Sequence, residues 1–367
     1  AKGIIPLPTA PIKEIVIGGV KKKCMVLAKG KGREMIFLAD YVGAPWKELL
    51  SNQIAWKLYM EYVREKRIEP KASLVRYFNT EDSKDLNIED VILEHKTLPS
   101  LIAESLSYHH KLKELYLSNA GINGEYLERF MKGLIHNKKA HIEIMILDNN
   151  GITREHVNYI NEYLQSESSF SLKKLSLSGN HLGDFGAQDL ADGLGQRLIK
   201  INSDVKKELS LPILELILSD CKIGDPGLFG LVGLFDKILK KFSNRGFEVQ
   251  KELMRFNLSH NAFSDNGLKA FAKMLKRFNG LSELDISHNY RLTADGFKYL
   301  IKALKKNYSL ATLKYYGNYI DTACLLILLD SLNDNYILKN IGLTIKREAV
   351  DGILTKEELV MRYFNIM

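Results

Sequence analysis

Hydrophobic residues between positions 172 and 194 follow a fixed pattern that changes its period partway along. Counted from the first leucine as slot 1, the unit holds Leu172 (slot 1), Leu175 (slot 4), Leu177 (slot 6) and Asn180 (slot 9). Apolar residues then recur with helical spacing up to Leu194. The segment predicts a short strand, a tight corner and a returning helix, which is the unit of a repeat protein. Because one unit cannot bury its apolar edge alone, we expect copies on both sides.

Copies of the unit follow one another through most of the chain. Slot 1 falls at Leu112, Ile142, Leu172, Ile213, Leu253, Leu281, Leu310 and Leu338. Slots 4 and 6 are hydrophobic or aromatic in each copy. A weaker copy ahead of these has its apolar slots at Ile88, Val91, Leu93 and Leu98. In the weak last copy, Thr355 and Glu358 fit a capping box before a final helix.

The repeat length and the helix after every strand resemble the ribonuclease-inhibitor type of leucine-rich repeat, over roughly residues 86–355. The resemblance implies that the Asn or Cys of slot 9 bonds to backbone groups of the corner and forms a ladder. An amide suits this role because it offers both a donor and an acceptor to a buried turn. The slot-9 residues are Ala120, Asn150, Asn180, Cys221, Asn261, Asn289, Asn318 and Lys346. Ala120 and Lys346 depart from the pattern, so the ladder is in doubt at both ends.

The predicted fold is an α/β solenoid with a curved parallel sheet inside and helices outside. Strands stack about 4.8 Å apart while packed helices need roughly 10 Å, so the strand side becomes concave. Two consecutive spacings between slot-1 residues are 41 and 40 instead of 28–30. The surplus lies around 197–211 and 237–251, and three extra helical turns would add roughly 18 Å to each helix. We therefore expect two adjacent extensions to project from one edge.

A different pattern occupies the N-terminal part and predicts a small α+β domain at residues 1–85, with the solenoid at 86–367. Alternating apolar residues predict strands at 14–20, 24–28 and 34–39, and an apolar stripe after Pro45 predicts a helix to about Arg67. Residues 1–80 hold 15 Lys and Arg against 7 Asp and Glu, which equals the net charge of +8 for the whole chain. The boundary near residue 80 is therefore visible in charge as well.

Candidate catalytic and metal-binding groups are accounted for better by the repeat. Ser259-His260-Asn261 and Ser287-His288-Asn289 occupy slots 7 to 9 of neighbouring copies, and nothing indicates a base orienter or an oxyanion site. No nucleotide-binding glycine motif, His/Cys cluster or cofactor motif is present. The three cysteines show no metal-ligand spacing and fit a reducing compartment, so we expect a cytoplasmic protein. Because no catalytic, cofactor or metal-binding motif is found, we also expect no cofactor, no metal and no enzymatic activity.

A protein partner on the concave face is the leading functional hypothesis. Slots 3, 5 and 7 leave the open face of the sheet because strand side chains alternate. The partner-binding residues predicted from these slots are Tyr116, Ile144, Ile146, Asp148, Lys174, Glu215, Ile217, Arg255, Asn257, Glu283, Asp285, Lys314 and Tyr316. Their mixed charge suits a contoured protein surface better than a uniform polyanion. Aromatic and arginine anchors usually dominate such interfaces, which favours Tyr116, Arg255 and Tyr316.

Three further hypotheses are compatible with the sequence. Repeats of the resembled type also occur in bacterial effectors, so the scaffold is compatible with a secreted effector acting in a host cell. A second hypothesis is a regulator of a partner enzyme, such as a GTPase-activating protein, for which Arg154 and Arg291 are the candidates. The basic N-terminal domain suits an acidic protein or an anionic lipid. Nucleic acid is less favoured there, because helical spacing assigns most of its aromatic residues to a core. No apolar run reaches the roughly 18 residues of a transmembrane segment.

Overall fold

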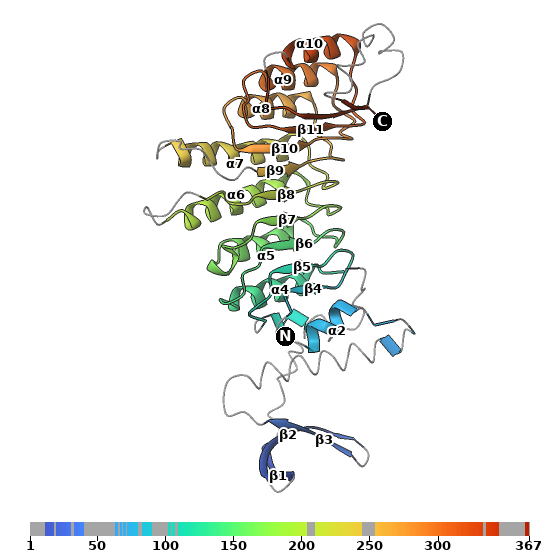
Figure 1. Ribbon diagram of the computed structural model, residues 1–367, viewed down its shortest axis with the longest axis vertical. Coiled ribbons are helices and arrows are strands. Elements are labelled where there is room, and N and C mark those ends of the chain that lie inside the picture. The colour runs from blue at the N-terminus through green and yellow to red at the C-terminus, as the bar shows by residue number, and fades with distance from the viewer. Residues whose placement is uncertain are drawn as a thin grey trace.

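The computed structural model describes residues 12–17, 20–30, 33–39, 63–64, 67, 69–70, 72–79, 83–89, 102–103, 105–106, 109–203, 210–243, 254–332, 335–344 and 364–366. Stacked repeats form most of this structure (Figure 1). Among the described residues, no helix has both the length and the apolar character needed to cross a membrane.

Ten parallel strands form the sheet of the solenoid, in the order β13-β12-β11-β10-β9-β8-β7-β6-β5-β4. The strands are β4 (Asp85–Asn87), β5 (Glu114–Tyr116), β6 (Ile144–Ile146), β7 (Lys174–Ser176), β8 (Glu215–Ile217), β9 (Met254–Asn257), β10 (Leu281–Asp285), β11 (Thr312–Tyr315), β12 (Asn340–Leu343) and β13 (Phe364–Ile366). Equal slots pair across neighbouring strands, as in Glu114 with Ile144 and Ile144 with Lys174. The predicted α/β leucine-rich-repeat solenoid is thus confirmed.

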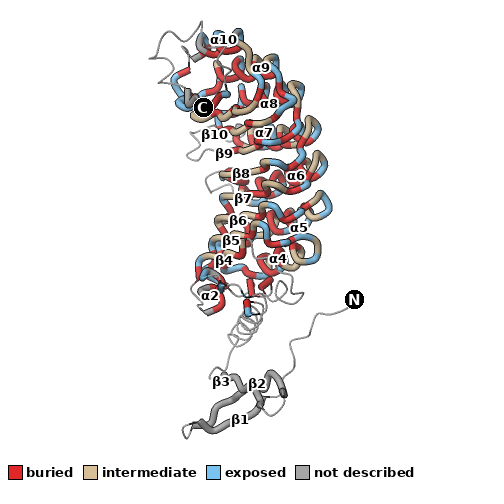
Figure 2. Tube along the Cα trace, turned by 90° about the vertical axis from the view of Figure 1, so that its right-hand side faces the viewer, coloured by how far each residue is buried: buried red, intermediate tan, exposed pale blue. Residues whose placement is uncertain are grey.

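Helices cover one face of the sheet, one for each connection from β5 to β12 (Figures 1 and 2). They are α4 (Gly124–His136), α5 (Arg154–Leu164), α6 (Gly183–Ile201), α7 (Asp225–Ser243), α8 (Asp265–Leu275), α9 (Ala294–Leu304) and α10 (Thr322–Leu332), with a short 3₁₀ helix η1 (Glu167–Ser169) after α5. The core lies between the sheet and the helices. Slot-4 residues such as Leu115, Leu175 and Leu284 are fully buried there.

The predicted slot-9 ladder is confirmed by its hydrogen bonds. Asn180 Oδ1 accepts from the backbone N–H groups of Asn150 and Ile152 at 3.0 Å each, and its Nδ2 donates to Leu147 O at 2.9 Å. Asn150, Asn261, Asn289 and Asn318 make equivalent contacts between repeats. Cys221 takes the same place, and its Sγ lies 3.1 Å from Leu177 O. Lys346 lies outside the described residues.

Removing one amide from this ladder should destabilise the protein. Replacing Asn180 with Ala leaves two backbone N–H groups buried without their acceptor, and we expect the free energy of unfolding to fall by about 2 kcal/mol. Urea unfolding measures the change. The matched control is Asn158→Ala, because Asn158 is exposed and its amide donates to Glu162 on its own helix. Equal stability of the two variants would contradict the structural role of slot 9.

A second ladder, which the sequence pattern does not predict, joins helix ends to the next strands. Asn307 Nδ2 donates to Leu275 O and Phe278 O of the preceding repeat. Asn137 and Asn335 make the corresponding contacts to the repeats that precede them. In the long repeat that contains α6, an arginine makes the comparable inter-repeat contact. Arg197 is only 1% exposed, and its guanidinium donates to backbone carbonyls on both sides.

A third ladder uses carboxylates at the helix N-termini. Asp225 Oδ1 accepts from Ser264 N and Gly267 N of the next repeat, and Asp184 and Asp265 act in the same way one repeat away. Gly267 leaves room for this contact, because a Cβ there would lie 2.5 Å from Asp225 Oδ1. The N-termini of α7, α8 and α9 are therefore capped partly by the repeat before them.

The first copy begins earlier than the sequence analysis placed it. Asp85 pairs with Glu114 and Leu86 with Leu115, so Leu86 holds slot 4 and Ile88 holds slot 6. Helix α2 (Ala72–Asn79) packs on this end, and its Leu74 and Tyr77 join the solenoid core. At the other end, β13 adds a strand that was not expected. The proposed capping box at Thr355 lies outside the described residues, and the boundary between domains at residue 85 stays a prediction.

Three antiparallel strands form a separate sheet near the N-terminus: β1 (Ile12–Ile17), β2 (Val20–Gly30) and β3 (Arg33–Ala39). They agree with the three expected strands, although β2 is longer and includes the lysines at 21–23 that were assigned to a connection. Most of the helix expected up to Arg67 lies outside the described residues; Val63 and Arg64 within it are helical.

The two long repeats project as expected, and the parts of their surplus at 204–209 and 244–253 lie outside the described residues. Helices α6 and α7 have 19 residues each, against 11 in α5, α8 and α9. The eight additional residues add about 12 Å. The two helices lie side by side and extend beyond their neighbours (Figure 1), with Lys237 Nζ 2.8 Å from Asp192 Oδ1. Their inner sides are buried at Leu198 and Ile238, so the described helical part of the extension belongs to the core.

Candidate functional site

The predicted partner-binding residues lie along the open face of the sheet, opposite the helices. In β5, β6 and β8, the slot-4 residue is buried while the slot-3 and slot-5 residues are partly exposed. This alternation places the predicted side chains on one surface, which we call the concave face and define by slots 3, 5 and 7 of β5–β11. All of the predicted residues are half-buried except Arg255, which is exposed.

An ion-pair network lies at the centre of the concave face. Glu215 accepts from Lys174 on the preceding strand and from Arg255 on the following strand, at 2.8 Å each. The Glu215 side chain is 18% exposed, whereas that of Arg255 is 58% exposed. One carboxylate therefore holds two cations in place across three strands. The outer part of the Arg255 side chain remains accessible to a partner.

The C-terminal part of the face is also internally paired. Lys314 Nζ lies 2.5 Å from Glu283 Oε1, and this hydrogen bond raises the pKa of Lys314. Asp285 accepts from Ser287 N, and Asn257 Oδ1 accepts from the backbone N–H and hydroxyl of Ser259. These contacts fix the side chains next to the strand ends.

Tyr316 is positioned by a glycine of the next strand. A Cβ at Gly342 would lie 2.2 Å from the Cζ atom of Tyr316, so only glycine leaves room for the ring in this position. The Tyr316 backbone N–H donates to Ser287 Oγ at 3.0 Å. The aromatic ring is thus held against the sheet, with its accessible part on the concave face.

The N-terminal part of the face is rich in carboxylates. Tyr116 donates to Glu114 Oε2 at 2.8 Å, and this bond, with the nearby charges of Asp85 and Glu89, raises the pKa of Tyr116 to about 12. Asp148 accepts from Ser176 Oγ at 2.5 Å, and burial raises its pKa. Sequence reasoning missed Asp85 and Glu89 because it began the first repeat too late. The alternation of Leu86 and Ile88, in register with Leu115 and Leu117, was the available signal.

The apolar residues do not form one patch. Ile146 on β6 pairs with Ser176 on β7, and Ser176 pairs with Ile217 on β8. Ile144 and Ile146 therefore lie together on one strand, and Ile217 lies two strands from them. The isoleucines of the predicted partner-binding set therefore form two smaller apolar contacts separated by Ser176.

The residues considered for catalysis and for regulation of a partner enzyme have structural partners. Ser259 bonds to Asn257 and Ser219, and the imidazoles of His260 and His288 stack on each other at 4.4 Å. Arg154 Nε lies 2.8 Å from Asp189 Oδ2, and Arg291 donates to Ala262 O. Within the described ranges, no group of three or more His, Cys, Asp and Glu side chains is placed to hold a metal ion.

Comparison with known proteins identifies the repeats. The family model described as "Leucine Rich repeat" matches residues 168–191, 211–232 and 253–272. Ribonuclease inhibitor of Sus scrofa is 27% identical over 210 residues, which cover 53% of this chain and 42% of the relative. Human capping protein, Arp2/3 and myosin-I linker protein 3 is 25% identical over 211 residues, or 57% of this chain and 14% of the relative. The chain thus matches less than half the length of either relative.

Two solved structures are also similar. The structure titled leiomodin-1 actin-binding site 2 has a TM-score of 0.35 and 14% identity, covering 48% of this chain and 86% of that one. A chain of the yeast Rad7 and Elc1 complex has a TM-score of 0.38 and 12% identity, covering 86% of both chains. The segments 168–191, 211–232 and 253–272 are therefore leucine-rich repeats, and the other copies share their slot pattern and resemble the ribonuclease-inhibitor type.

Proposed function

We propose that this leucine-rich-repeat protein is a scaffold that binds a folded protein partner on its concave face. The observation that carries the proposal is the accessible, structurally fixed set of side chains that includes Tyr116, Arg255 and Tyr316. Each is held by a neighbour on the sheet, so little side-chain freedom is lost on binding. A rigid surface with aromatic and arginine anchors is typical of a protein interface.

The similar proteins support the general class of this function. The name of one relative describes a linker of capping protein, Arp2/3 and myosin-I, and that of another describes an inhibitor of ribonuclease. Both names denote action through another protein. The use of the concave face, a role as an effector and the absence of enzymatic activity remain proposals for this chain.

Substitution of the anchors tests the concave face. We expect Tyr116→Ala and Arg255→Ala each to weaken partner binding by about 1–2 kcal/mol, because both remove contact area at the accessible surface. Thermal stability should change little, since neither residue fills a core slot. Partners captured from a lysate by the full chain supply the ligand, and calorimetry with the purified partner gives the affinity.

The control for this experiment lies on the helix side. Phe229 on α7 is 47% exposed and is as large as the anchors, so Phe229→Ala tests a general effect of removing an aromatic side chain. Normal binding by both concave-face variants, together with loss of binding in Phe229→Ala, would place the interface on the helices instead.

A further inference from the structure

Charge is separated between the two long edges of the solenoid. All strands of its sheet are parallel, and each helix from α4 to α10 leads from the end of one strand to the start of the next, so helix C-termini and strand starts share one edge. We call this the entry edge and define it by the described residues between each helix end and the next strand, together with the last helical residues at 136, 200–201 and 240–243. It holds 13 Lys and Arg against two Glu, counted over 109–113, 136–143, 165–173, 200–203, 210–214, 240–243, 276–280, 305–311 and 335–339.

The opposite edge has the reverse charge. Between the strand ends and the first helical residues it holds three Lys and Arg against nine Asp and Glu, counted over 118–125, 148–155, 178–184, 219–225, 259–265, 287–295 and 316–321. The overall charge of the chain after residue 80 is zero, so this separation arises only when the chain folds. Basic doublets recur on the entry edge at 138–139, 240–241, 276–277 and 305–306.

Helix dipoles account for part of this pattern. Cations stabilise helix C-termini, which gives a reason for lysines in the last turns. The dipole gives no reason for Lys111, Lys173 and Lys339, which precede strands and are exposed. Some of the edge cations have local partners: Lys173 contacts Glu143, Arg277 contacts Asp236 and Lys305 contacts Asp330. Counting Asp236 and Asp330 with the edge still leaves a large positive excess.

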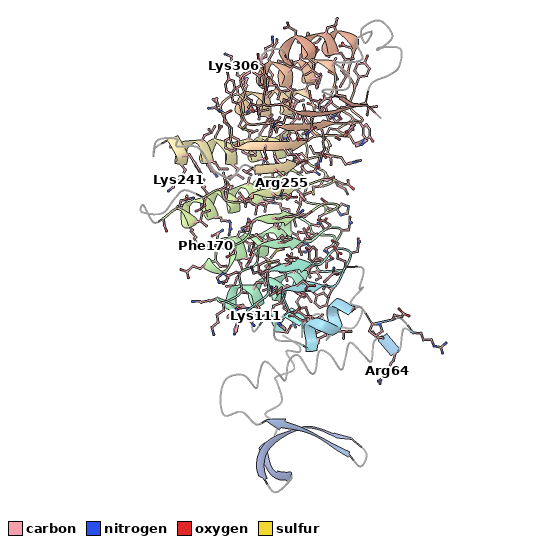
Figure 3. All side chains as sticks on the ribbon, viewed as in Figure 1. Arg64, Lys111, Phe170, Lys241, Arg255 and Lys306 are labelled. Carbon is pink, nitrogen blue, oxygen red and sulfur yellow. The ribbon has the colours of Figure 1, made fainter. Side chains whose placement is uncertain are left out.

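Exposed apolar and aromatic side chains accompany these lysines. Tyr308 and Tyr336 are 67% and 87% exposed, and they occupy equivalent corners of successive repeats. Phe170, at the corner after η1, is 42% exposed, and Ile199, in the last turn of α6, is 55% exposed. Figure 3 places Phe170, Lys241 and Lys306 on the side on which α6 and α7 project. The helix dipole gives no reason for exposed tyrosine and phenylalanine at these positions.

We propose that the entry edge docks on an anionic lipid membrane, with lysines at the headgroups and the protruding Tyr and Phe side chains at the interface. Strands about 4.8 Å apart give an edge of about 35 Å from β5 to β12, long enough for many lipid contacts. Twelve of the 13 cations are lysines. Lysine acts as a point charge and suits a diffuse anionic surface, whereas nucleic-acid recognition favours the bidentate fork of arginine. Tyrosine is typical of membrane–water interfaces.

Vesicle co-sedimentation with the full chain tests this proposal. The edge variant replaces Lys138, Lys139, Lys276 and Lys306 with Gln; the control variant replaces Lys222, Lys269, Arg291 and Lys298 with Gln. Both lower the net charge by the same amount. Each basic residue near an anionic surface contributes about 1 kcal/mol, so the edge variant should bind phosphatidylserine-containing vesicles at least tenfold more weakly. The control variant should stay within about twofold, and vesicles of phosphatidylcholine alone should bind neither protein.

Two further measurements distinguish the entry edge from the other basic surfaces of the chain. Tyr308→Ala with Tyr336→Ala should weaken vesicle binding severalfold and leave its salt dependence unchanged, because no charge is removed.

A third variant, with Lys21, Lys22 and Lys23 changed to Gln, tests the basic N-terminal region. Equal loss of binding in the edge and control variants, or loss confined to the N-terminal variant, would overturn the proposal. If the edge variant still binds vesicles but no longer binds an RNA oligonucleotide or polyglutamate, the edge is assigned to those ligands instead.

Discussion

Replacing Arg197 with Leu is expected to lower the free energy of unfolding by about 3–5 kcal/mol, which is a large fraction of the stability of most domains. The guanidinium donates to Pro212 O at 2.6 Å, Ser169 O at 2.5 Å, Leu172 O at 3.0 Å and Phe170 O at 3.3 Å, and it also contacts the Ser169 hydroxyl. Leucine fills similar space but donates nothing. The variant therefore leaves several carbonyl oxygens buried without a donor.

The charge of Arg197 opposes part of this stabilisation. Burial lowers the pKa of Arg197 to about 10, so the group is still protonated at neutral pH and its desolvation has a cost. We expect the hydrogen bonds to outweigh that cost, because the guanidinium joins the turn of one repeat to the connection that leads into the next strand. Urea unfolding of Arg197→Leu and Arg197→Lys measures the balance. Lysine keeps the charge but has fewer donors, so its effect should be intermediate.

The matched control is Arg277→Leu. Arg277 is also at a helix end, but its side chain is 62% exposed and pairs with Asp236 on the neighbouring helix. Exposed ion pairs contribute at most about 1 kcal/mol, so this variant should be close to the wild type. If Arg197→Leu is as stable as the wild type or more so, the desolvation cost of the guanidinium equals or exceeds the gain from its bonds.

The sequence predicts the repeats well because their signal is local and repeated. The period of the leucines fixes which residues enter the core, and equal slots then pair across the sheet, as Glu114, Ile144 and Lys174 do. The slot-9 amides follow from the same reasoning, since a buried corner needs a donor and an acceptor at one position. The first repeat was placed too late because the leucines that follow Ile88 fit the repeat spacing nearly as well as Leu86 and Ile88 do.

Arg197 and the charged edges were not predicted for a different reason. An arginine within a helical pattern is normally a surface residue, and only the turn of another repeat supplies the carbonyls that surround Arg197. Likewise, the acidic and basic residues beyond position 80 cancel in composition. They separate because parallel strands bring all helix C-termini to one edge. The concave face was predictable only in part. The sequence pattern predicts the slots that form it, whereas the Lys174–Glu215–Arg255 network depends on the register across three strands.

Acidification from pH 6.5 to pH 4 is expected to remove about 3 kcal/mol of stability through His109 alone. His109 is 3% exposed and stacks on Tyr77 at 4.0 Å. Burial, with the neighbouring charge of His110, lowers the pKa of His109 to about 4, against 6.5 in an unfolded chain. Between these values the unfolded chain binds a proton that the folded protein excludes. The contribution is therefore complete above pH 6.5 and is lost as pH falls towards 4.

His109→Phe isolates this contribution. Phenylalanine keeps the aromatic contact with Tyr77 but has no proton to bind, so its unfolding free energy should depend less steeply on pH. Other groups titrate in the same range, and the difference between wild type and variant removes them. Urea unfolding at pH 7.5 and pH 4.5 supplies the four values needed. His141→Gln is the control, because His141 is exposed and its substitution removes an imidazole from the surface instead of the core. Parallel pH profiles for the wild type and His109→Phe would show that His109 gains a proton in the folded protein as easily as in the unfolded one.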